Sequence, residues 1–401
     1  MEINSPTLFV EINNADYLFV VGDKNEQDDL KIIYKCIVPS QGFIDNKITN
    51  FDLVFSTIKK NIYLIEQKLN FTFQNVILII SNFDCSFINL TGFKKLNGSQ
   101  ILKENITYIL NSMKASIDKI ENEKTILHIF NLRFNLDQKK LENLPIGLFG
   151  NFYSHELSFC LINNNDYKNL NNIFNKCNLK INRVLLKSFI EGAHISDSNN
   201  NLDTFFQIKI NQNNSQIFYF ENNSLKFEQN FDFGTNLIIK DISKITSLKT
   251  DIINKIINNN SLDKYILSEE LIEKELFENE NYTKIKKKLI YEIAEARIQE
   301  ILEILIIKNI NFVSLDKKDK TVFLRIADKS HLKCFKDKYN HFLINNNFTI
   351  KFLENISTDD LIDSVNKLVH FGWKKEAIPI VDAKKSIICL LYTSDAADEE
   401  D

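Results

Sequence analysis

Two stretches of the sequence, starting nearly two hundred residues apart at positions 8 and 205, repeat one pattern of strands. LFVEINNADYLFVVGDKNEQDDLKIIYKCIVP (8–39) and FFQIKINQNNSQIFYFENNSLKFEQNFDF (205–233) each alternate three strand-like runs with two polar turns. Such runs, bounded by polar turn residues, are typical of a three-strand meander. The repeat predicts a duplicated domain whose turns face each other across a cleft.

The segments that follow the first meander extend the pattern to β-β-β-α-β. FDLVFSTIKKNIYLIEQKL (51–69) spaces its apolar residues for one face of a helix, and NVILIIS (75–81) is a short apolar run. Residues 85–163 then predict a small inserted α+β unit. A helix and the strand INRVLLKSF (181–189) resume the first half.

The second meander leads into a stretch that is largely helical from about residue 250 to 309. Its longest amphipathic helix is predicted over 283–306, TKIKKKLIYEIAEARIQEILEILI. The residues expected on its apolar stripe are Ile285, Leu289, Ile293, Ile301, Ile304 and Leu305. The strand TVFLRIAD (321–328) and the helix HLKCFKDKYNHFLI (331–344) are expected to close the fold.

Composition excludes several classes of protein. A net charge of -4 provides no broad basic face, so nucleic acid is not an expected partner. The six cysteines lack CxxC spacing, which argues against a zinc site and against a secreted disulfide framework. No HxxH or HExxH pattern and no Ser-His-Asp or Cys-His constellation nominates a metal ligand or a catalytic residue.

Glycine is scarce, and this bears on function. Average usage predicts about 28 glycines in a chain of this length. The sequence has 9. A loop that cradles phosphate needs glycine for positive φ and for close approach of the backbone to the ligand.

Four segments together resemble the FtsA family of actin-like bacterial cell-division proteins. They are QGFIDNKITNFDLVFSTIKKNI (41–62), ILHIFNLRFNLDQKKLENLPIGLFG (126–150), NLNNIFNKCNLKINRVLLKSFIEGAHI (169–195) and FGTNLIIKDI (233–242). The resemblance implies an α/β, actin-like ATPase-domain fold, which is a duplicated ribonuclease-H-like fold, with an inserted α+β domain of the SHS2 type. The expected domains are subdomain 1A (1–84 and 164–197), the SHS2-type 1C (85–163), 2A (198–245 and 318–375) and 2B (246–317).

The resemblance also locates three nucleotide loops, and all three have lost their glycines. The matching positions are Glu11, Asn13 and Asn14 in the first loop, Lys209, Asn211, Asn213, Asn214 and Ser215 in the second, and Ile326, Ala327 and Asp328 in the third. The family binds ATP and Mg²⁺, but Cβ atoms here stand where phosphate and adenine approach the backbone. We therefore expect a pseudo-ATPase with no catalytic residue, no metal ligand and no required cofactor.

Two interpretations of the second loop stay open. In one, asparagine tolerates the left-handed conformation, keeps the turns and nothing binds. In the other, Lys209 supplies the positive charge that Mg²⁺ would have brought and holds a triphosphate directly.

The long helix supplies the candidate partner site. In FtsA the corresponding region receives the C-terminal peptide of FtsZ. Arg297 and Glu300 stand at i and i+3, close enough for one polar patch, and an arginine can grip a peptide carboxylate. The alternative is an ordinary ion pair on the helix surface.

The resemblance implies an adaptor that tethers FtsZ filaments to the cytoplasmic face of the membrane at midcell. It also implies self-association into filaments and contacts with other division proteins through the inserted domain. FtsA attaches to the membrane by a C-terminal amphipathic helix. No such helix is recognised here, and CLLYTSDAADEED (389–401) looks like translated sequencing adapter, a non-native tail. The alternatives are an active actin-like ATPase and a pilus-assembly adaptor resembling PilM.

Overall fold

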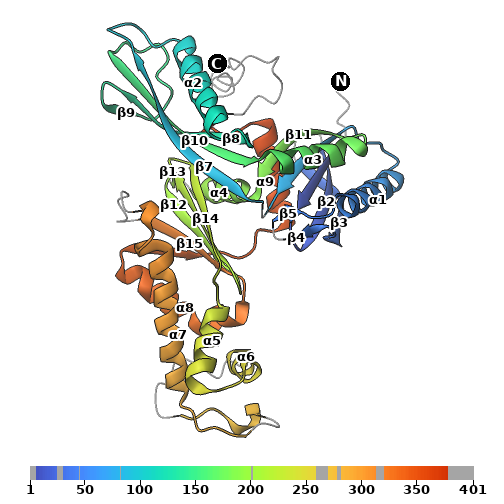
Figure 1. The fold of residues 1–401 in the computed structure, drawn as a ribbon, viewed down its shortest axis with the longest axis vertical. Helices are drawn as coiled ribbons and strands as arrows, with labels where there is room; N and C mark the ends of the chain where they lie inside the picture. The colour runs from blue at the N-terminus through green and yellow to red at the C-terminus, as the bar shows by residue number, and fades with distance from the viewer. Residues whose placement is uncertain are drawn as a thin grey trace. The chain divides into compact units, whose positions relative to one another are not determined.

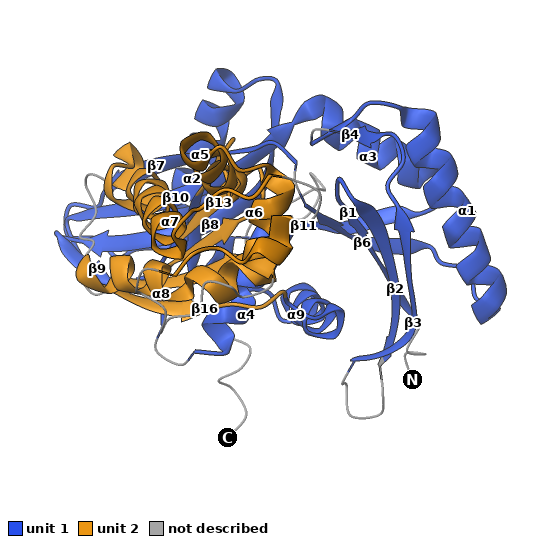
Figure 2. Ribbon diagram, turned by 90° about the horizontal axis from the view of Figure 1, so that it is seen from below, with its two compact units in different colours: residues 1–203, 220–227, 356–401 blue, residues 204–219, 228–355 orange. Residues whose placement is uncertain are grey.

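The structure is a computed structural model that describes most of the chain. The described residues are 6–24, 30–44, 46–81, 83–199, 202–258, 270–277, 281–312 and 320–377. The predicted tail at 389–401 lies outside them. The chain forms two compact units (Figure 2): a first unit of residues 1–203, 220–227 and 356–401, and a second unit of residues 204–219 and 228–355.

The first unit contains a five-stranded sheet in the order β11-β6-β1-β2-β3 (Figure 1). Its strands are β1 (Thr7–Ile12), β2 (Asp16–Lys24), β3 (Leu30–Pro39), β6 (Asn75–Ile80) and β11 (Lys180–Leu186). The first three pair antiparallel as the predicted meander, while β6 and β11 run parallel to β1. A short hairpin of β4 (Phe43–Ile44) and β5 (Lys47–Ile48) follows β3.

Four helices accompany this sheet. They are α1 (Phe51–Leu69), α3 (Asn164–Lys176), α4 (Lys187–Asp197) and α9 (Thr358–His370). The α1 and α3 helices pack together, and so do α4 and α9. The α1 helix begins at Asn50, whose side chain accepts a hydrogen bond from the Leu53 N–H, and it ends at Asn70 in the left-handed conformation. It buries Val54, Ile58, Ile62 and Ile65, which are four of the positions that the helical spacing predicts.

The second sheet has the order β14-β13-β12-β15-β16. Read from its other end, this is the order of the first sheet, with β12, β13 and β14 in the places of β1, β2 and β3. Its strands are β12 (Phe205–Ile210), β13 (Ser215–Glu221), β14 (Ser224–Phe231), β15 (Lys320–Ile326) and β16 (Phe348–Phe352). Again β15 runs parallel to the first strand of the meander, and β16 runs parallel to β15. Two sheets with one topology confirm the predicted duplicated, ribonuclease-H-like fold.

The second unit has its own helices. They are α5 (Asn236–Thr246), α6 (Thr250–Asn258), η1 (Lys274–Phe277), α7 (Lys287–Leu302), the π-turn η2 (Glu303–Ile307), η3 (Ile310–Phe312) and α8 (Lys329–Asn345). The α7 helix packs against α5 and α8 (Figure 1).

Helix α7 is shorter than predicted, and its buried stripe matches the predicted one only in part. Residues before Lys287 are extended because Lys286 bridges to Leu271 and the Ile285 carbonyl accepts the Ile272 N–H. Leu289 and Ile304, both predicted to be core, are 40% and 37% exposed. The other four residues of the predicted stripe are buried as expected, namely Ile285, Ile293, Ile301 and Leu305. Ile290, Ala294 and Ile298 are buried as well, where α5 and α8 pack against α7.

Two other predicted boundaries are wrong. The strand expected over 181–189 ends at Leu186, because its partner β6 ends opposite, at Ile80, and α4 begins at Lys187. The fold does not close with α8. Strand β16 extends the second sheet, and α9 packs on α4 in the first unit.

An α+β unit is inserted between β6 and α3, as predicted. It consists of β7 (Cys85–Lys95), α2 (Lys103–Ile120), β8 (Lys124–Leu136), β9 (Lys139–Leu141) and β10 (Phe152–Asn163). Its sheet has the order β17-β8-β10-β7, in which β17 (Glu376–Ala377) comes from the end of the described chain. The core lies between this sheet and α2, with Ile109, Met113, Tyr153 and Phe159 buried there. That the insert is of the SHS2 type stays a prediction.

The hairpin end at residues 220–227 belongs to the first unit because it bonds to the inserted sheet. Glu221 accepts hydrogen bonds from Arg133 Nε at 2.9 Å and from Lys226 Nζ at 2.7 Å. Ser224 Oγ donates to the Asn131 carbonyl at 2.6 Å. Although its burial would raise the pKa of Glu221, the two cations lower it. The predicted subdomain boundaries do not follow this division into units, and they stay a prediction.

Two buried histidines predict loss of stability in mild acid. Burial lowers the pKa of His155 to about 3 and that of His331 to about 4. His155 donates to Asn131 Oδ1 at 2.9 Å, and His331 Nε2 lies 3.0 Å from the Tyr339 hydroxyl. The unfolded chain binds protons below pH ~6.5 while both folded histidines stay neutral. The free energy of unfolding therefore shows no loss from these histidines above that pH. Below it, the free energy of unfolding falls by about 1.4 kcal/mol per histidine per pH unit.

Urea unfolding at several pH values between 5.0 and 7.5 tests this pH dependence, a window chosen to lie above the ordinary carboxyl range of about 4. The slope of stability against pH is expected to flatten in His155→Gln. It is expected to stay unchanged in His341→Gln, because His341 is exposed. Equal slopes in the wild type and His155→Gln would contradict the assignment.

Candidate functional site

The first predicted loop joins β1 to β2, and asparagine side chains hold it closed. Asn13 Oδ1 accepts hydrogen bonds from the backbone N–H groups of Ala15 at 2.8 Å and Asp16 at 2.9 Å. Asn13 Nδ2 donates to the Asp16 carboxylate at 2.9 Å. Asn14 bonds to Asn46 through both its amide atoms. The N–H groups at 15 and 16, which a phosphate loop would present to an anion, are bonded to a side-chain oxygen of the loop itself.

Glu11, on β1, is buried and bonded inside the first unit. Its side chain is 3% exposed, and Oε1 accepts from Ser81 Oγ at 2.8 Å and from Lys187 Nζ at 2.7 Å. Ser81 follows β6, and Lys187 follows β11. Since β1, β6 and β11 are neighbouring parallel strands, their carboxyl ends meet at one edge of the sheet. The carboxylate thus has a protein cation and a protein hydroxyl as partners.

The asparagines in these loops do not take the left-handed conformation. In other parts of the described chain, asparagine often takes the left-handed conformation, with positive φ at Asn46, Asn70, Asn97, Asn178, Asn222, Asn223 and Asn347. None of the five loop asparagines, all of which the structure describes, has positive φ. The expectation that tolerance of this conformation keeps the turns is therefore wrong. Side-chain amide hydrogen bonds hold them.

Lys209 lies in the interior of the second unit. It is on β12, 5% exposed, with Nζ 4.7 Å from the ring centroid of Phe218. A cation over an aromatic face is stabilised by the ring quadrupole. This placement packs the ammonium against the core of its own unit, in contrast to the interpretation in which Lys209 holds a triphosphate directly.

The rest of the second loop is an asparagine-closed turn. The Asn211 N–H donates to the Asn214 carbonyl at 2.9 Å, and the two side-chain amides bond at 2.6 Å. Asn213 Oδ1 accepts from Asn236 Nδ2 at 2.8 Å. Ser215 begins β13, and its hydroxyl donates to a backbone carbonyl at 2.7 Å.

Gly234 is a retained glycine with a steric reason. A Cβ at this position would lie 2.1 Å from the Asn211 carbonyl oxygen. The N–H groups of Thr235 and Asn236 donate to the carbonyls of Asn211 and Gln212. The glycine therefore lets the start of α5 pack directly on the turn.

The third set of positions lies beside the second. Ile326 ends β15 and pairs with Ile210, and the Ala327 N–H donates to the Ile210 carbonyl at 3.0 Å. Asp328 is the N-cap of α8 and accepts from the His331 N–H at 2.9 Å. The structure brings these two loops to one edge of the second sheet because β12 and β15 are parallel neighbours. The carboxylate of Asp328 has a capping role there.

Arg297 and Glu300 form the predicted patch on α7, with a third member that the sequence did not indicate. Arg297 Nη1 donates to Glu300 Oε2 at 2.6 Å, and Nε donates to Asp241 of α5. The hydrogen bond to Asp241 raises the pKa of Arg297. Arg297 remains 26% exposed, so its guanidinium is paired within the protein and still reachable from solvent.

Comparison with curated proteins gives the relatives of this chain. The FtsA cell-division protein of Buchnera aphidicola subsp. Schizaphis graminum is 25% identical over 234 residues, which are 58% of this chain and 56% of the relative. FtsA of Neisseria meningitidis serogroup B is 22% identical over 242 residues, 60% of this chain and 57% of the relative. The chain is a divergent homologue of FtsA. The match spans little more than half the length of these relatives, and no family model matches the sequence.

Solved structures with a similar fold include two actin-like proteins. The PilM–PilN type IV pilus biogenesis complex aligns with 91% of this FtsA homologue and 96% of its own chain, at 8% identity and a TM-score of 0.48. MreB 5 of Spiroplasma citri bound to AMPPNP aligns with 92% and 96%, at 10% identity and a TM-score of 0.42.

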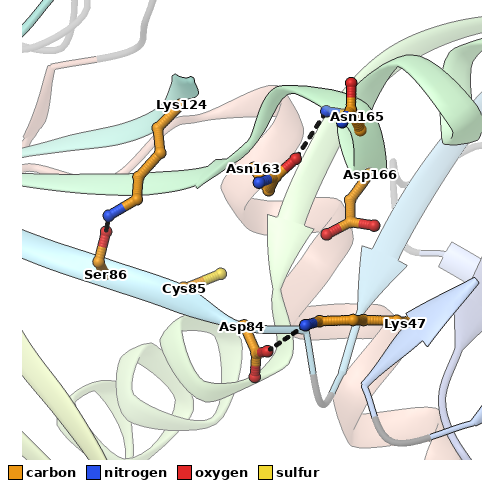
Figure 3. Close-up of a pocket in the computed structure, with 8 residues that line it drawn as sticks. All are labelled: Lys47, Asp84, Cys85, Ser86, Lys124, Asn163, Asn165 and Asp166. Carbon is orange, nitrogen blue, oxygen red and sulfur yellow. Dashed lines mark hydrogen bonds and ion pairs between the residues drawn. The ribbon is translucent and has the colours of Figure 1, made fainter. Parts of the chain in front are cut away.

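A pocket in the first unit of this FtsA homologue, lined by polar residues and a cysteine, was not indicated by the sequence (Figure 3). Its volume is about 400 Å³, and its lining residues are Lys47, Asp84, Cys85, Ser86, Lys124, Asn163, Asn165 and Asp166. Figure 3 shows Lys124 bonded to Ser86, at 3.1 Å, and Lys47 facing Asp84, at 3.9 Å. Burial raises the pKa of Asp166, although the charge of Lys47 opposes this. The lining comes from several separate segments, so no spacing in the sequence could reveal it.

The described ranges of this FtsA homologue have two further properties. Within these ranges, no three or more His, Cys, Asp or Glu side chains are arranged to hold a metal ion. None of the helices described is long and apolar enough to cross a membrane.

Proposed function

We propose that this FtsA homologue is a cell-division adaptor that links FtsZ filaments to the cytoplasmic membrane and helps to assemble the division machinery. The observation that carries the proposal is the alignment with proteins named FtsA over 58–60% of the chain. The duplicated fold with an insert between β6 and α3 agrees with it. The adaptor acts on the cytoplasmic face of the membrane at midcell.

The adaptor works without ATP hydrolysis. Hydrolysis by this superfamily needs carboxylates that position Mg²⁺ and water beside the phosphates. Here the Glu11 carboxylate is bonded to Lys187, Asp328 caps a helix, and Lys209 stands where the family has a carboxylate. These contacts favour the adaptor over the alternative of an active ATPase.

The inserted unit is the second contact surface of the adaptor, for further copies and for other division proteins. Phe93 of β7 and Phe152 of β10 stack with ring centroids 5.6 Å apart, and both are exposed. Phe149 is 71% exposed. It forms a β-bridge with Gln100, which lies in the loop that precedes α2. Exposed aromatic groups of this kind are typical of protein interfaces.

Arg297 is the proposed contact for the FtsZ C-terminal peptide, and its charge reversal tests this. Arg297→Glu is expected to weaken binding of a fluorescent peptide with that sequence at least about tenfold, measured by anisotropy on the full chain. The physical reason is loss of the cation that a peptide carboxylate would bind and the addition of a third carboxylate beside Asp241 and Glu300.

The matched control is Lys338→Glu, which reverses a charge on α8 that pairs with Glu295 of α7 at 2.6 Å. This variant is expected to bind the peptide as the wild type does. If Arg297→Glu folds and its affinity equals that of Lys338→Glu, Arg297 is only an ion-pair partner on the helix surface, and the assignment fails.

A further inference from the structure

The magnesium nucleotide that the actin-like fold implies does not fit the first loop of this chain. A phosphate needs free N–H donors and a counter-cation. The N–H groups of Ala15 and Asp16 already donate to Asn13 Oδ1, at 2.8 and 2.9 Å. The carboxylate at the end of β1 already has a cation, Lys187, at 2.7 Å.

The position of Lys187 makes this cation unusual. It is the first residue of α4, and the first turn of α4 contains no acidic residue. The N-terminus of a helix carries a partial positive charge, so a lysine there is unfavourable unless an anion lies close. Glu11, 3% exposed, is that anion, and Ser81 Oγ donates to the same oxygen at 2.8 Å. Each of the two charged groups therefore compensates the other in a place where neither is stable alone.

The two halves of a bound magnesium phosphate each have a counterpart in the protein. An amide oxygen accepts from the loop N–H groups, as a phosphate oxygen would, and an ammonium group neutralises the acid of β1, as a metal ion with its waters would. We propose that Asn13 and Lys187 are built-in substitutes for the phosphate and the cation, so that the first unit keeps its loop closed without nucleotide.

This inference deepens the part of the proposed function that dispenses with ATP hydrolysis, and it names what replaces the ligand. It does not depend on whether the chain binds FtsZ. A chain that binds Mg·ATP would overturn it and leave FtsZ binding open, whereas failure to bind FtsZ would leave it standing.

The first test is thermal unfolding of the full chain with and without about 5 mM Mg·ATP, a concentration at which a specific site would raise the melting temperature by several degrees. The expected shift is below about 1 °C. A larger rise overturns the proposal, because the loop would then accept the nucleotide that its own side chains are proposed to replace.

The second test measures Lys187 directly in the wild-type chain and adds one variant as a comparison. Brief acetylation by an N-hydroxysuccinimide ester, read by mass spectrometry, is expected to modify Lys187 about ten times more slowly than Lys180, an exposed lysine on β11. Mg·ATP is expected to leave the rate of Lys187 unchanged. Glu11→Gln is expected to bring it close to that of Lys180. Equal rates in the wild type, or protection of Lys187 by Mg·ATP, would overturn the proposal.

Discussion

Replacement of Arg183 by methionine is expected to lower the free energy of unfolding by about 3–5 kcal/mol, the usual cost of leaving one partner of a buried ion pair alone. The partner is Glu376, whose side chain is 0% exposed. Arg183 Nη2 donates to Glu376 Oε2, and His128 Nδ1 lies 2.6 Å from Oε1. Arg183 also donates to the Leu368 carbonyl at the end of α9. Methionine keeps most of the side-chain volume, so the loss measures the charge and its hydrogen bonds.

The pH dependence of this cluster has a defined sign. Burial would raise the pKa of Glu376, but its ion pair with Arg183 and its hydrogen bond to His128 outweigh this effect and lower the pKa overall. The stabilisation is present above the ordinary glutamate pKa of about 4.3 and is lost as the pH falls through the lower folded value. Urea unfolding at pH 7 measures the cost of Arg183→Met.

The control for Arg183 is the double variant Arg183→Met/Glu376→Gln, which removes the stranded charge. It is expected to recover at least half of the loss, because an uncharged amide is far cheaper to bury than a carboxylate. A loss below about 1 kcal/mol in Arg183→Met would contradict the account of this cluster, since that is the range of exposed ion pairs.

Lys187→Met is expected to cost about 3 kcal/mol, for the same reason but with a more exposed cation. Glu11 is 3% exposed and Lys187 is 28% exposed, so the carboxylate is the group left buried. The measurement is urea unfolding followed by circular dichroism at pH 7. Methionine at the start of α4 also removes an unfavourable interaction with the helix dipole, which offsets part of the cost.

A double-mutant cycle with Glu11→Gln isolates the Lys187 pair. The coupling between Glu11→Gln and Lys187→Met is expected to be at least about 1.5 kcal/mol, as in other buried charge pairs. Additive losses would mean that the 2.7 Å contact between Lys187 and Glu11 does not itself stabilise the fold. This result would contradict the proposal that Lys187 substitutes for a bound cation.

The sequence predicts the sheets well because each meander and its helix are encoded locally. The strand-like runs separated by polar turns at 8–39 and 205–233 and the apolar spacing of 51–69 indicate strand and helix without distant contacts. Only part of the face that α7 buries could be predicted in this way. Its stripe depends on α5 and α8, so Leu289 is exposed although its spacing is that of a core residue.

For the candidate site, the sequence indicates where the loops lie along the chain but not which contacts their residues make. The resemblance locates the three loops, and Asn13 and Asn211 do lie at the ends of β1 and β12. The partner of Glu11, however, is 176 residues further along the chain, and no spacing rule joins them. The Asp241 partner of Arg297 is likewise on another helix. Contacts between distant segments are set by the topology of the sheet, which a local pattern does not contain.

The most direct test of the adaptor account is binding of the full chain to a fluorescent FtsZ C-terminal peptide from the same organism, by anisotropy, with and without Mg·ATP. The account predicts a dissociation constant on the order of micromolar that is the same in both conditions. Binding that requires Mg·ATP would contradict nucleotide independence and show that the asparagine-rich loops still hold a ligand. No binding in either condition would contradict the FtsZ adaptor itself and favour a pilus-type adaptor.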